Sequence, residues 1–149
     1  MLFSIYEHEL WLDVMDEFGR TTLLNACIGL GFTREQSIAA VNTAIDGREN
    51  LDLADLGGWT ALHFAAQNND AEVCEFLLDA GAFVDPVDSF GNTPLWRAVF
   101  SCRGDGDCIR VFRTYDANPL LENFSGISPV KLARTIGNYD VERFFSDLL

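Results

Sequence analysis

The chain has 149 residues, a length that suits one domain with a packed core. Apolar residues make up 48% of the chain and prolines number only 4, which argues against a disordered chain. Ten basic and 23 acidic residues give a net charge of -13 at pH 7. This charge disfavours binding to nucleic acid or to an anionic membrane and favours a basic partner, although acidity also serves solubility alone.

The first fifteen residues predict a helix that covers the apolar face of the unit after it. Ser4-x-x-Glu7 forms a capping box, and Leu10, Trp11 and Val14 follow at helical spacing. The segment carries acids where a secretory signal would carry positive charge, and it has no apolar run long enough to span a membrane. We therefore predict a cytoplasmic protein.

A pattern of about 33 residues then recurs. The clearest copy is 55–87, and 16–54, 88–122 and 123–149 repeat it with an insertion or a truncation. Every copy places an Asp or Asn three residues before a Gly, with a Thr or Ser two residues further on. Two helices follow in each copy. One such unit cannot bury its own apolar face, so neighbouring units are expected to stack.

The copies differ in their connections. In the first copy, Thr33-x-x-Gln36 predicts a second helix that runs to about Asp46. In the third, the glycine-rich segment Cys102–Asp107 holds two extra residues and predicts a flexible loop between the helices.

The fourth copy predicts the end of the array. Val141, Phe144 and Phe145 match the second helix, and the chain stops before any closing Gly-Ala turn. Lys131 and Arg134 stand where apolar residues would face a further unit, which supports termination here.

The central copy carries the most specific motif. Thr60–Ala66 reads T-x-L-H-x-A-A, and Leu77-Leu78 and Gly81-Ala82 close the second helix. On these residues the chain resembles the ankyrin-repeat family. The resemblance implies an all-α fold, an ankyrin-repeat solenoid of helix-turn-helix units. We expect one domain over residues 1–149, with a capping helix at 1–15 and four repeats.

The sequence shows no catalytic or metal-binding motif, so we predict that the chain is not an enzyme and uses no metal or cofactor. The sequence lacks Cys-x-x-Cys, His-Glu-x-x-His, Gly-x-Ser-x-Gly and a phosphate-binding loop. The resemblance gives His63 a structural role between neighbouring turns, and His8 is expected in solvent. The Asp-Gly-Asp of the third copy lacks the other ligands of a calcium loop.

The four cysteines are expected to be reduced in a cytoplasmic protein. Cys27 and Cys74 fall at apolar helix positions and are assigned to the core. Cys102 and Cys108 flank the predicted loop, so a disulfide between them is the alternative to two free thiols.

In ankyrin repeats the turn tips and the exposed side of the first helices form the binding face. Aromatic residues with an Arg nearby are favoured interface anchors, although rings at these tips could instead fold back and be half buried. The loop between Cys102 and Cys108 is a second place for contact. The candidate partner-binding residues are Phe18, Arg20, Leu56, Trp59, Gln67, Asn68, Phe90, Asn92, Arg97, Phe100 and Phe124.

The sequence predicts a non-catalytic module that is monomeric when free and binds one protein partner. The chain looks similar to small stand-alone bacterial ankyrin proteins that act as immunity factors and neutralise an antibacterial toxin. Its acidity would suit a basic toxin such as a nuclease. The alternative is a regulatory or adaptor ankyrin protein in a signalling or transcription complex.

Overall fold

The computed structural model describes residues 15–137 and 139–148, and its regular elements are helices. The predicted capping box and all but the last residue of the predicted capping helix lie outside the described part. In chain order the helices are α2 (Thr22–Ile28), α3 (Arg34–Asp46), α4 (Ala61–Gln67), α5 (Ala71–Asp79), α6 (Pro94–Ser101), α7 (Asp107–Thr114), α8 (Pro129–Thr135) and η2 (Glu142–Leu148).

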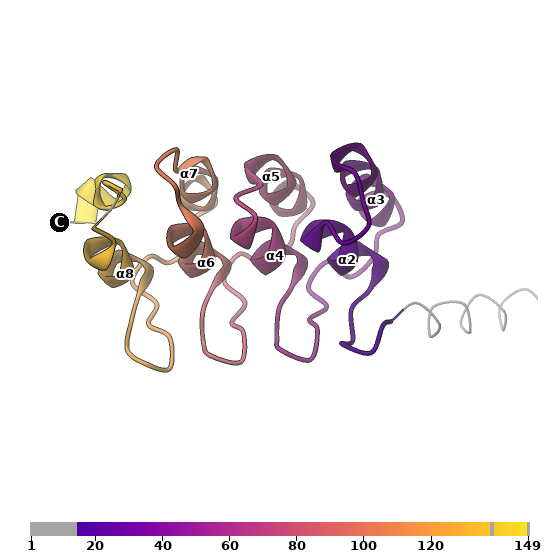
Figure 1. The fold of residues 1–149 in the computed structure, drawn as a ribbon, viewed down its shortest axis with the longest axis horizontal. Helices are drawn as coiled ribbons and strands as arrows, with labels where there is room; N and C mark the ends of the chain where they lie inside the picture. Colours follow the sequence, from indigo (N-terminus) through magenta and orange to yellow (C-terminus); the bar gives the residue numbers. More distant parts are fainter. Residues whose placement is uncertain (1–14, 138, 149) are drawn as a thin grey trace, which may run out of the picture.

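The helices form two layers (Figure 1). The first helices α2, α4, α6 and α8 contact one another in sequence, and α3, α5 and α7 line up beside them. Each first helix is preceded by a hairpin loop, and the hairpins project along one edge of the stack. With no strand in the described residues, this arrangement confirms the predicted all-α solenoid.

Short polar side chains set where the helices begin. Thr33 and Gln36 form the capping box predicted for α3, with Gln36 N 3.3 Å from Thr33 Oγ1 and Thr33 N 2.8 Å from Gln36 Oε1. This helix ends at Asp46, as predicted. A hydroxyl residue stands at the N-cap of each first helix: Thr21, Thr60, Thr93 and Ser128. The side chains of Thr21, Thr93 and Ser128 each accept a hydrogen bond from a backbone N–H of the first turn, whereas Thr60 Oγ1 lies 3.0 Å from His63 Nδ1.

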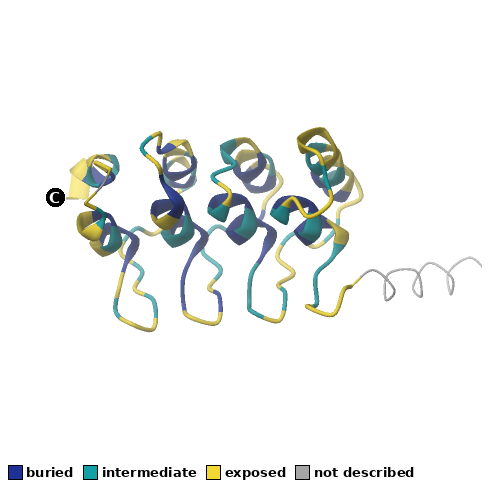
Figure 2. Ribbon diagram, in the orientation of Figure 1, coloured by how far each residue is buried: buried dark blue, intermediate teal, exposed yellow. Residues whose placement is uncertain are grey.

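The core lies between the two layers and between neighbouring units (Figure 2). Each first helix has an almost fully buried alanine at the same position of the repeat, and its small volume lets adjacent helices pack closely: Ala26, Ala65, Ala98 and Ala133. Larger side chains of the second helices, including Leu77, Ile109 and Phe112, are fully buried beside them. Burying each of these large side chains contributes about 1.5–3 kcal/mol to the stability of the fold. Because much of this burial occurs between neighbouring units, the stack is stable whereas a single unit is not.

The last unit differs from a full repeat. Its second helix, η2, is a 3₁₀ helix with a non-helical backbone at Phe145 rather than an α-helix. Val141 and Phe145 are buried, whereas Phe144 lies between two guanidinium groups, those of Arg110 and Arg143, each 4.9 Å from its ring centre. The end of the array is therefore held partly by cation–π contacts.

The loop predicted in the third unit is present between α6 and α7, and it is anchored to its neighbours. The Arg143 side chain donates to the Gly104 carbonyl at 2.6 Å, and Asn69 donates to the Asp105 carboxylate at 3.0 Å. Gly106 has a φ of 68°, and a Cβ there would lie 2.0 Å from the Phe144 ring. The loop that holds the extra residues thus packs against Arg143 and Phe144 of the last unit.

The four cysteines are free and buried. Cys27 and Cys74 lie in the core, as predicted, and burial raises the pKa of the Cys27 thiol to about 12. A hydrogen bond between the Cys74 and Cys108 thiols, together with burial, raises the pKa of Cys74. Cys102 is not bonded to Cys108 but accepts a hydrogen bond from Gly104 N at 3.4 Å. Cys27 and Cys74, buried and with raised pKa values, are poor nucleophiles.

Candidate functional site

The hairpins are joined into one rigid edge by backbone hydrogen bonds. Leu56 N donates to Phe18 O, Ser89 N to Gly57 O and Phe124 N to Phe90 O, each at 3.0 Å. Within each hairpin, an Asp or Asn side-chain oxygen accepts from the backbone N–H groups two and four residues later. These bonds leave the hairpin tips little freedom to move relative to one another.

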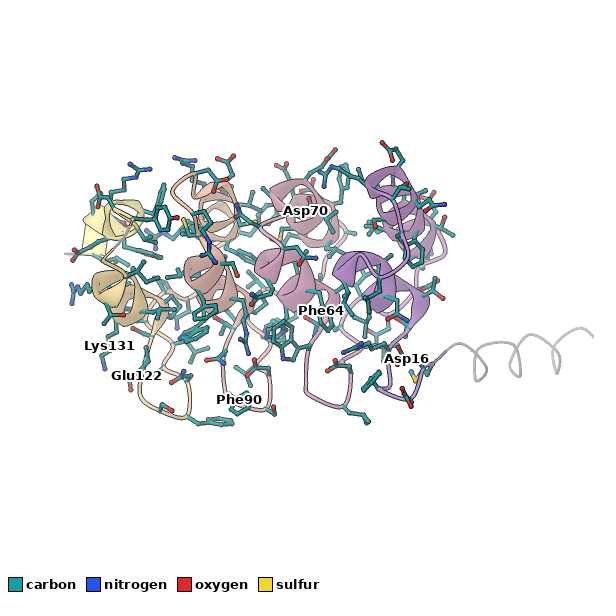
Figure 3. All side chains as sticks on the ribbon, in the orientation of Figure 1. Asp16, Phe64, Asp70, Phe90, Glu122 and Lys131 are labelled. Atoms are coloured by element: carbon teal, nitrogen blue, oxygen red, sulfur yellow. The ribbon has the colours of Figure 1, made fainter. Side chains whose placement is uncertain are left out.

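Each of these hairpins presents a large apolar side chain to solvent at its tip. Figure 3 shows Phe90 at the far end of its hairpin, away from the helices. We call the four residues the tip row, and their exposed fractions are 49% for Phe18, 81% for Leu56, 66% for Phe90 and 77% for Phe124. Because apolar side chains at such exposure are costly in water, the tip row has the character of a contact surface.

A second feature, the aromatic–arginine cluster, lies between the hairpins and the first helices. Its residues are Phe18, Arg20, Trp59, Phe64, Trp96, Arg97 and Phe100. The Arg20 guanidinium lies 4.6 Å from the Phe18 ring centre and 5.8 Å from that of Phe64, which is labelled in Figure 3. The Phe64 ring is in turn 5.0 Å from Trp59.

The stacking continues across the next unit. The Arg97 guanidinium lies 4.1 Å from the Trp59 ring centre and 5.4 Å from Trp96, and Trp96 stacks on Phe100 at 5.5 Å with an interplanar angle of 13°. Cation–π contacts of this kind contribute about 0.5–2 kcal/mol each, depending on exposure. The cluster therefore ties the hairpins of the first two units to helices α4 and α6.

Both arginines of the cluster are neutralised by carboxylates of this chain. Arg20 Nε is 3.5 Å from Asp55 Oδ2, and Arg97 pairs with Asp88, whose side chain is 0% exposed. Burial would raise the pKa of Asp88, but the Arg97 guanidinium and two backbone N–H groups outweigh it and hold that pKa below its ordinary value. The cluster is thus rigid and close to electrically neutral.

The structure divides the eleven predicted contact residues into three groups. Phe18, Arg20, Trp59, Arg97 and Phe100 come together in the cluster, where the Trp59 ring is half-buried. Leu56, Phe90 and Phe124 complete the tip row. The remaining three are Gln67, Asn68 and Asn92.

These three amides belong to neither the cluster nor the tip row. Asn92 is buried, with its Oδ1 accepting from Asn123 at 2.8 Å and its carbonyl 2.9 Å from His63 Nε2. Asn68 donates to the Cys27 carbonyl at 2.8 Å and so joins two units, and Gln67 beside it is half-buried. We assign Asn92 and Asn68 structural roles.

Sequence reasoning left out two members of the cluster, Phe64 and Trp96. Trp96 stands where the repeat has its His, and Phe64 directly follows that His in the central copy. Both are aromatic residues at the junction of hairpin and first helix. The signal that could have identified them is an aromatic residue at one of these two adjacent register positions, and Trp96 in addition directly precedes Arg97.

Asn68→Ala should lower the free energy of unfolding by about 1–2 kcal/mol, because the Cys27 carbonyl would lose its partner in a partly buried site. Gln67→Ala is the matched control, since the Gln67 Oε1 has no partner among the described residues and its loss should cost less. Urea unfolding of both variants measures the difference. Equal costs would show that the bond between the units contributes nothing.

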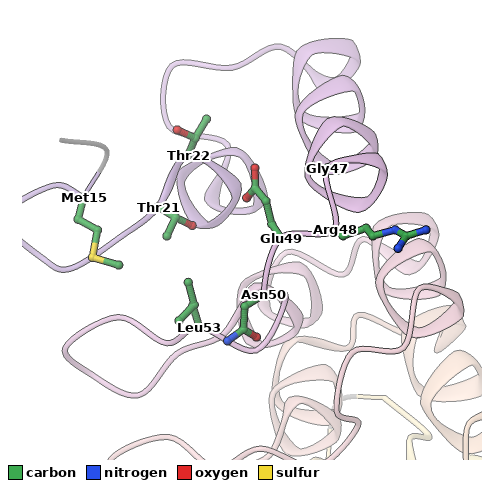
Figure 4. A pocket seen from close by; sticks show the side chains of 8 residues that line it. All are labelled: Met15, Thr21, Thr22, Gly47, Arg48, Glu49, Asn50 and Leu53. Atoms are coloured by element: carbon green, nitrogen blue, oxygen red, sulfur yellow. The ribbon is translucent and has the colours of Figure 1, made fainter. Parts of the chain in front are cut away.

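An open hollow of about 470 Å³ lies beside the first unit, next to Met15 (Figure 4). No His or Cys lines it, and its lining residues are Met15, Thr21, Thr22, Gly47, Arg48, Glu49, Asn50 and Leu53. Within the described chain, no group of three His, Cys, Asp or Glu residues is placed to hold a metal ion. No helix in that same part is long and apolar enough to cross a membrane.

A stack of helix pairs with a rigid, partly apolar hairpin edge defines a solenoid repeat protein of the kind that binds other proteins. Residues 3–82 and 32–123 match the family model described as "Ankyrin repeats (3 copies)", and the chain belongs to the ankyrin-repeat family. An ankyrin-repeat array is a protein–protein interaction module, and this is the function of the chain at its coarsest level.

Relatives come from several kinds of organism. The chain is 25% identical over 133 residues to the tyrosine-protein kinase HTK16 of Hydra vulgaris, covering 67% of this chain and 18% of the kinase. A putative ankyrin repeat protein of Rickettsia bellii is 36% identical over 56% of this chain and 36% of its own length. The human BCL-6 corepressor-like protein 1 is 32% identical over 68% of this chain and 5% of its own length. The chain therefore spans only a minor part of each of these relatives.

Proposed function

We propose that this ankyrin-repeat chain binds one protein partner through its hairpin edge and blocks a surface of that partner, as an immunity protein neutralises an antibacterial toxin. The observation that carries the proposal is the tip row, in which four hydrogen-bonded hairpins each expose one large apolar side chain. The aromatic–arginine cluster adjoins the row at Phe18, which belongs to both.

The energetics favour tight binding by a short array. Removing a Phe or Leu side chain from water contributes about 1.5–3 kcal/mol, so four tip residues offer several kcal/mol. The bonds between hairpins have already ordered these residues, so little conformational entropy is lost on binding. The surface is therefore suited to blocking a partner without any catalytic step.

The charge of the chain points to a basic partner. Nine acids and no Lys or Arg lie in the stretch 49–95, within a chain of net charge -13. The cluster arginines are already paired with carboxylates of this chain. The remaining negative charge therefore acts on a partner mainly through its long-range electrostatic field, which accelerates the association of a basic protein such as a nuclease toxin. Four reduced, buried thiols favour a cytoplasmic location, and like-charge repulsion favours a monomer when free.

Replacing Leu56 and Phe90 together by serine should weaken partner binding by at least about 2 kcal/mol while changing stability little, since both side chains are mostly exposed. Leu30→Ser with Phe83→Ser is the matched control, because those two side chains are each 58% exposed and are not tip residues. The partner is first isolated by affinity purification of the full chain and identified by mass spectrometry. Equal affinity of both double variants would remove the tip row from the proposal.

Toxin neutralisation itself is tested in cells. A toxin encoded beside the gene should kill when expressed alone and be harmless when this chain is expressed with it. Protection should fail with the Leu56→Ser and Phe90→Ser pair. If the neighbouring toxin kills regardless, or no toxin-like protein co-purifies, the immunity proposal is wrong.

The second candidate is a regulatory or adaptor protein. The observation in its favour is that the chain spans 18% of a kinase and 5% of a corepressor-like protein among its relatives. A partner that is a signalling or transcription component, with no toxin gene nearby, would support the adaptor over the immunity protein.

A further inference from the structure

The linkers that lead from one unit into the next hairpin share a short sequence pattern. It consists of an apolar residue, an Asp, two further residues and the Asp that opens the hairpin, and it occurs at 51–55 and 84–88. The same pattern occurs at 12–16, ahead of the first unit. In the last linker, 119–123, Leu and Asn replace the two Asp residues. Residues 12–15 therefore have the sequence of a linker.

The first Asp of each such linker binds the backbone of the unit that follows. Asp52 Oδ1 accepts a hydrogen bond from Phe83 N at 2.8 Å, and Asp85 Oδ2 accepts one from Asn118 N at 3.0 Å. The apolar residue before each of these Asp residues is partly buried against the core. A linker is thus held to the next unit by one side-chain hydrogen bond and one apolar contact.

The first unit has the equivalent backbone donor. In the second and third units the donor comes two positions after a residue of positive φ, Gly81 at 93° and Asp116 at 58°. Arg48, with a φ of 54°, holds this position in the first unit, so the equivalent donor is Asn50 N–H. No acceptor for it lies among the described residues. The place that a preceding linker would take is therefore open at the first unit.

The hollow of about 470 Å³ beside Met15 lies at this open place (Figure 4). Residues 47–50 line it, and with them the backbone that carries the Asn50 donor. Two partly exposed apolar side chains also line it, Met15 at 51% and Leu53 at 40% exposure. The hollow thus offers both the hydrogen-bond donor and the apolar surface that a linker uses.

The second unit shows the same place with its linker present. Residues 80–81, which correspond to 47–48 of the first unit, line a hollow together with the linker residues 51 and 52. At the first unit, the residues of matching sequence are attached at the rim, because Met15 lines the hollow. Consecutive Cα atoms are 3.8 Å apart, so the Asp13 Cα lies within about 8 Å of the Met15 Cα.

We infer that residues 12–14 of this chain occupy the hollow beside Met15, with Leu12 against the first unit and the Asp13 carboxylate accepting from Asn50 N–H. Residues 12–15 are then a linker like 51–54 rather than the end of the predicted capping helix. The attached segment has a high effective concentration at the hollow, whereas a second copy would bring a further net charge of -13. The inference concerns the chain alone and holds whatever its partner is.

The hydrogen bond is tested by amide exchange with water in the full ¹⁵N-labelled chain, measured by NMR. Asn50 N–H should exchange at least about tenfold more slowly than in an unstructured chain, as one charge-assisted bond provides, and Asp13→Ala should remove most of this protection. Asp52→Ala is the matched control, because it removes the equivalent bond. It should accelerate exchange of Phe83 N–H by a similar factor and leave Asn50 N–H unchanged.

The apolar contact has its own test. Leu12→Ser should accelerate exchange of Asn50 N–H by about threefold or more, whereas Leu120→Ser, at a 60% exposed position of the last linker, should not. Nuclear Overhauser effects should connect the Leu12 methyl groups with Leu53. The inference is wrong if Asn50 N–H is unprotected, or if its protection survives both Asp13→Ala and Leu12→Ser while Asp52→Ala exposes Phe83 N–H. Protection that appears only at high protein concentration would assign the hollow to a second copy and also overturn the inference.

Discussion

Gly91→Ala should destabilise the array by at least about 3 kcal/mol. Gly91 has a φ of 78°, and a Cβ at this position would lie 2.8 Å from the backbone nitrogen of Phe124. Backbone strain in the left-handed region costs about 1–2 kcal/mol, and the clash adds to it because the neighbouring hairpin cannot move without losing the Phe124 N–H bond to Phe90 O. Urea unfolding followed by circular dichroism measures the loss.

Gly81→Ala is the matched control for this substitution. Gly81 has a φ of 93°, but a Cβ there meets nothing within 4 Å. The control should therefore show the strain alone, about 1–2 kcal/mol. The difference between the two variants isolates the close stacking of hairpins. Equal losses at Gly81 and Gly91 would mean that the hairpins adapt to the added methyl group at no cost.

Lowering the pH from 6.5 to 4 should remove about 3 kcal/mol of unfolding free energy through His63 alone. Burial lowers the pKa of His63 from 6.5 to about 4; the Arg97 charge adds to this, and the Asn92 carbonyl and the Asp88 and Asp55 charges oppose it. The folded state thus favours the neutral ring. This contribution is complete above pH 6.5, falls as the pH drops, and is lost near pH 4.

The hydrogen bonds around the ring explain why protonation is unfavourable. Thr60 N–H donates to His63 Nδ1 at 3.2 Å, so the proton of the neutral ring sits on Nε2, which donates to the Asn92 carbonyl at 2.9 Å. A second proton on Nδ1 would face the Thr60 N–H. His63 thereby joins the central hairpin to the next one, and only its neutral form can make both bonds.

Urea unfolding at pH 7, 6, 5 and 4 tests this, with His63→Gln as the control. The variant should be less stable at pH 7 and should show a shallower loss over this range. The pKa of Asp85 is raised by burial, against the Asn118 N–H bond that lowers it, but this group titrates in both proteins and cancels in the comparison. A loss of equal size in the variant would assign the pH dependence to carboxylates.

The sequence by itself determined the parts of this protein that depend on neighbouring residues. The caps at Thr33 and Thr93 and the glycine turn at Gly91 are local, because each hydrogen bond or dihedral angle involves residues within about four positions. Because these caps and turns recur in the copies, the sequence predicted the stack of helix pairs. The apolar helix position of Cys74 likewise predicted its burial. The start and end of α3 were predicted correctly for the same reason.

Only the tertiary structure decided which tip residues face solvent and which hold the array together. Leu56 is 81% exposed, whereas Trp59, three residues later, is half-buried beneath the guanidinium of Arg97, which lies in the next unit. Asn92 is buried through a bond to Asn123, 31 residues away, and η2 becomes a 3₁₀ helix where Phe144 fits over Gly106. Burial depends on groups about one repeat distant, and their positions are known only once the units are stacked.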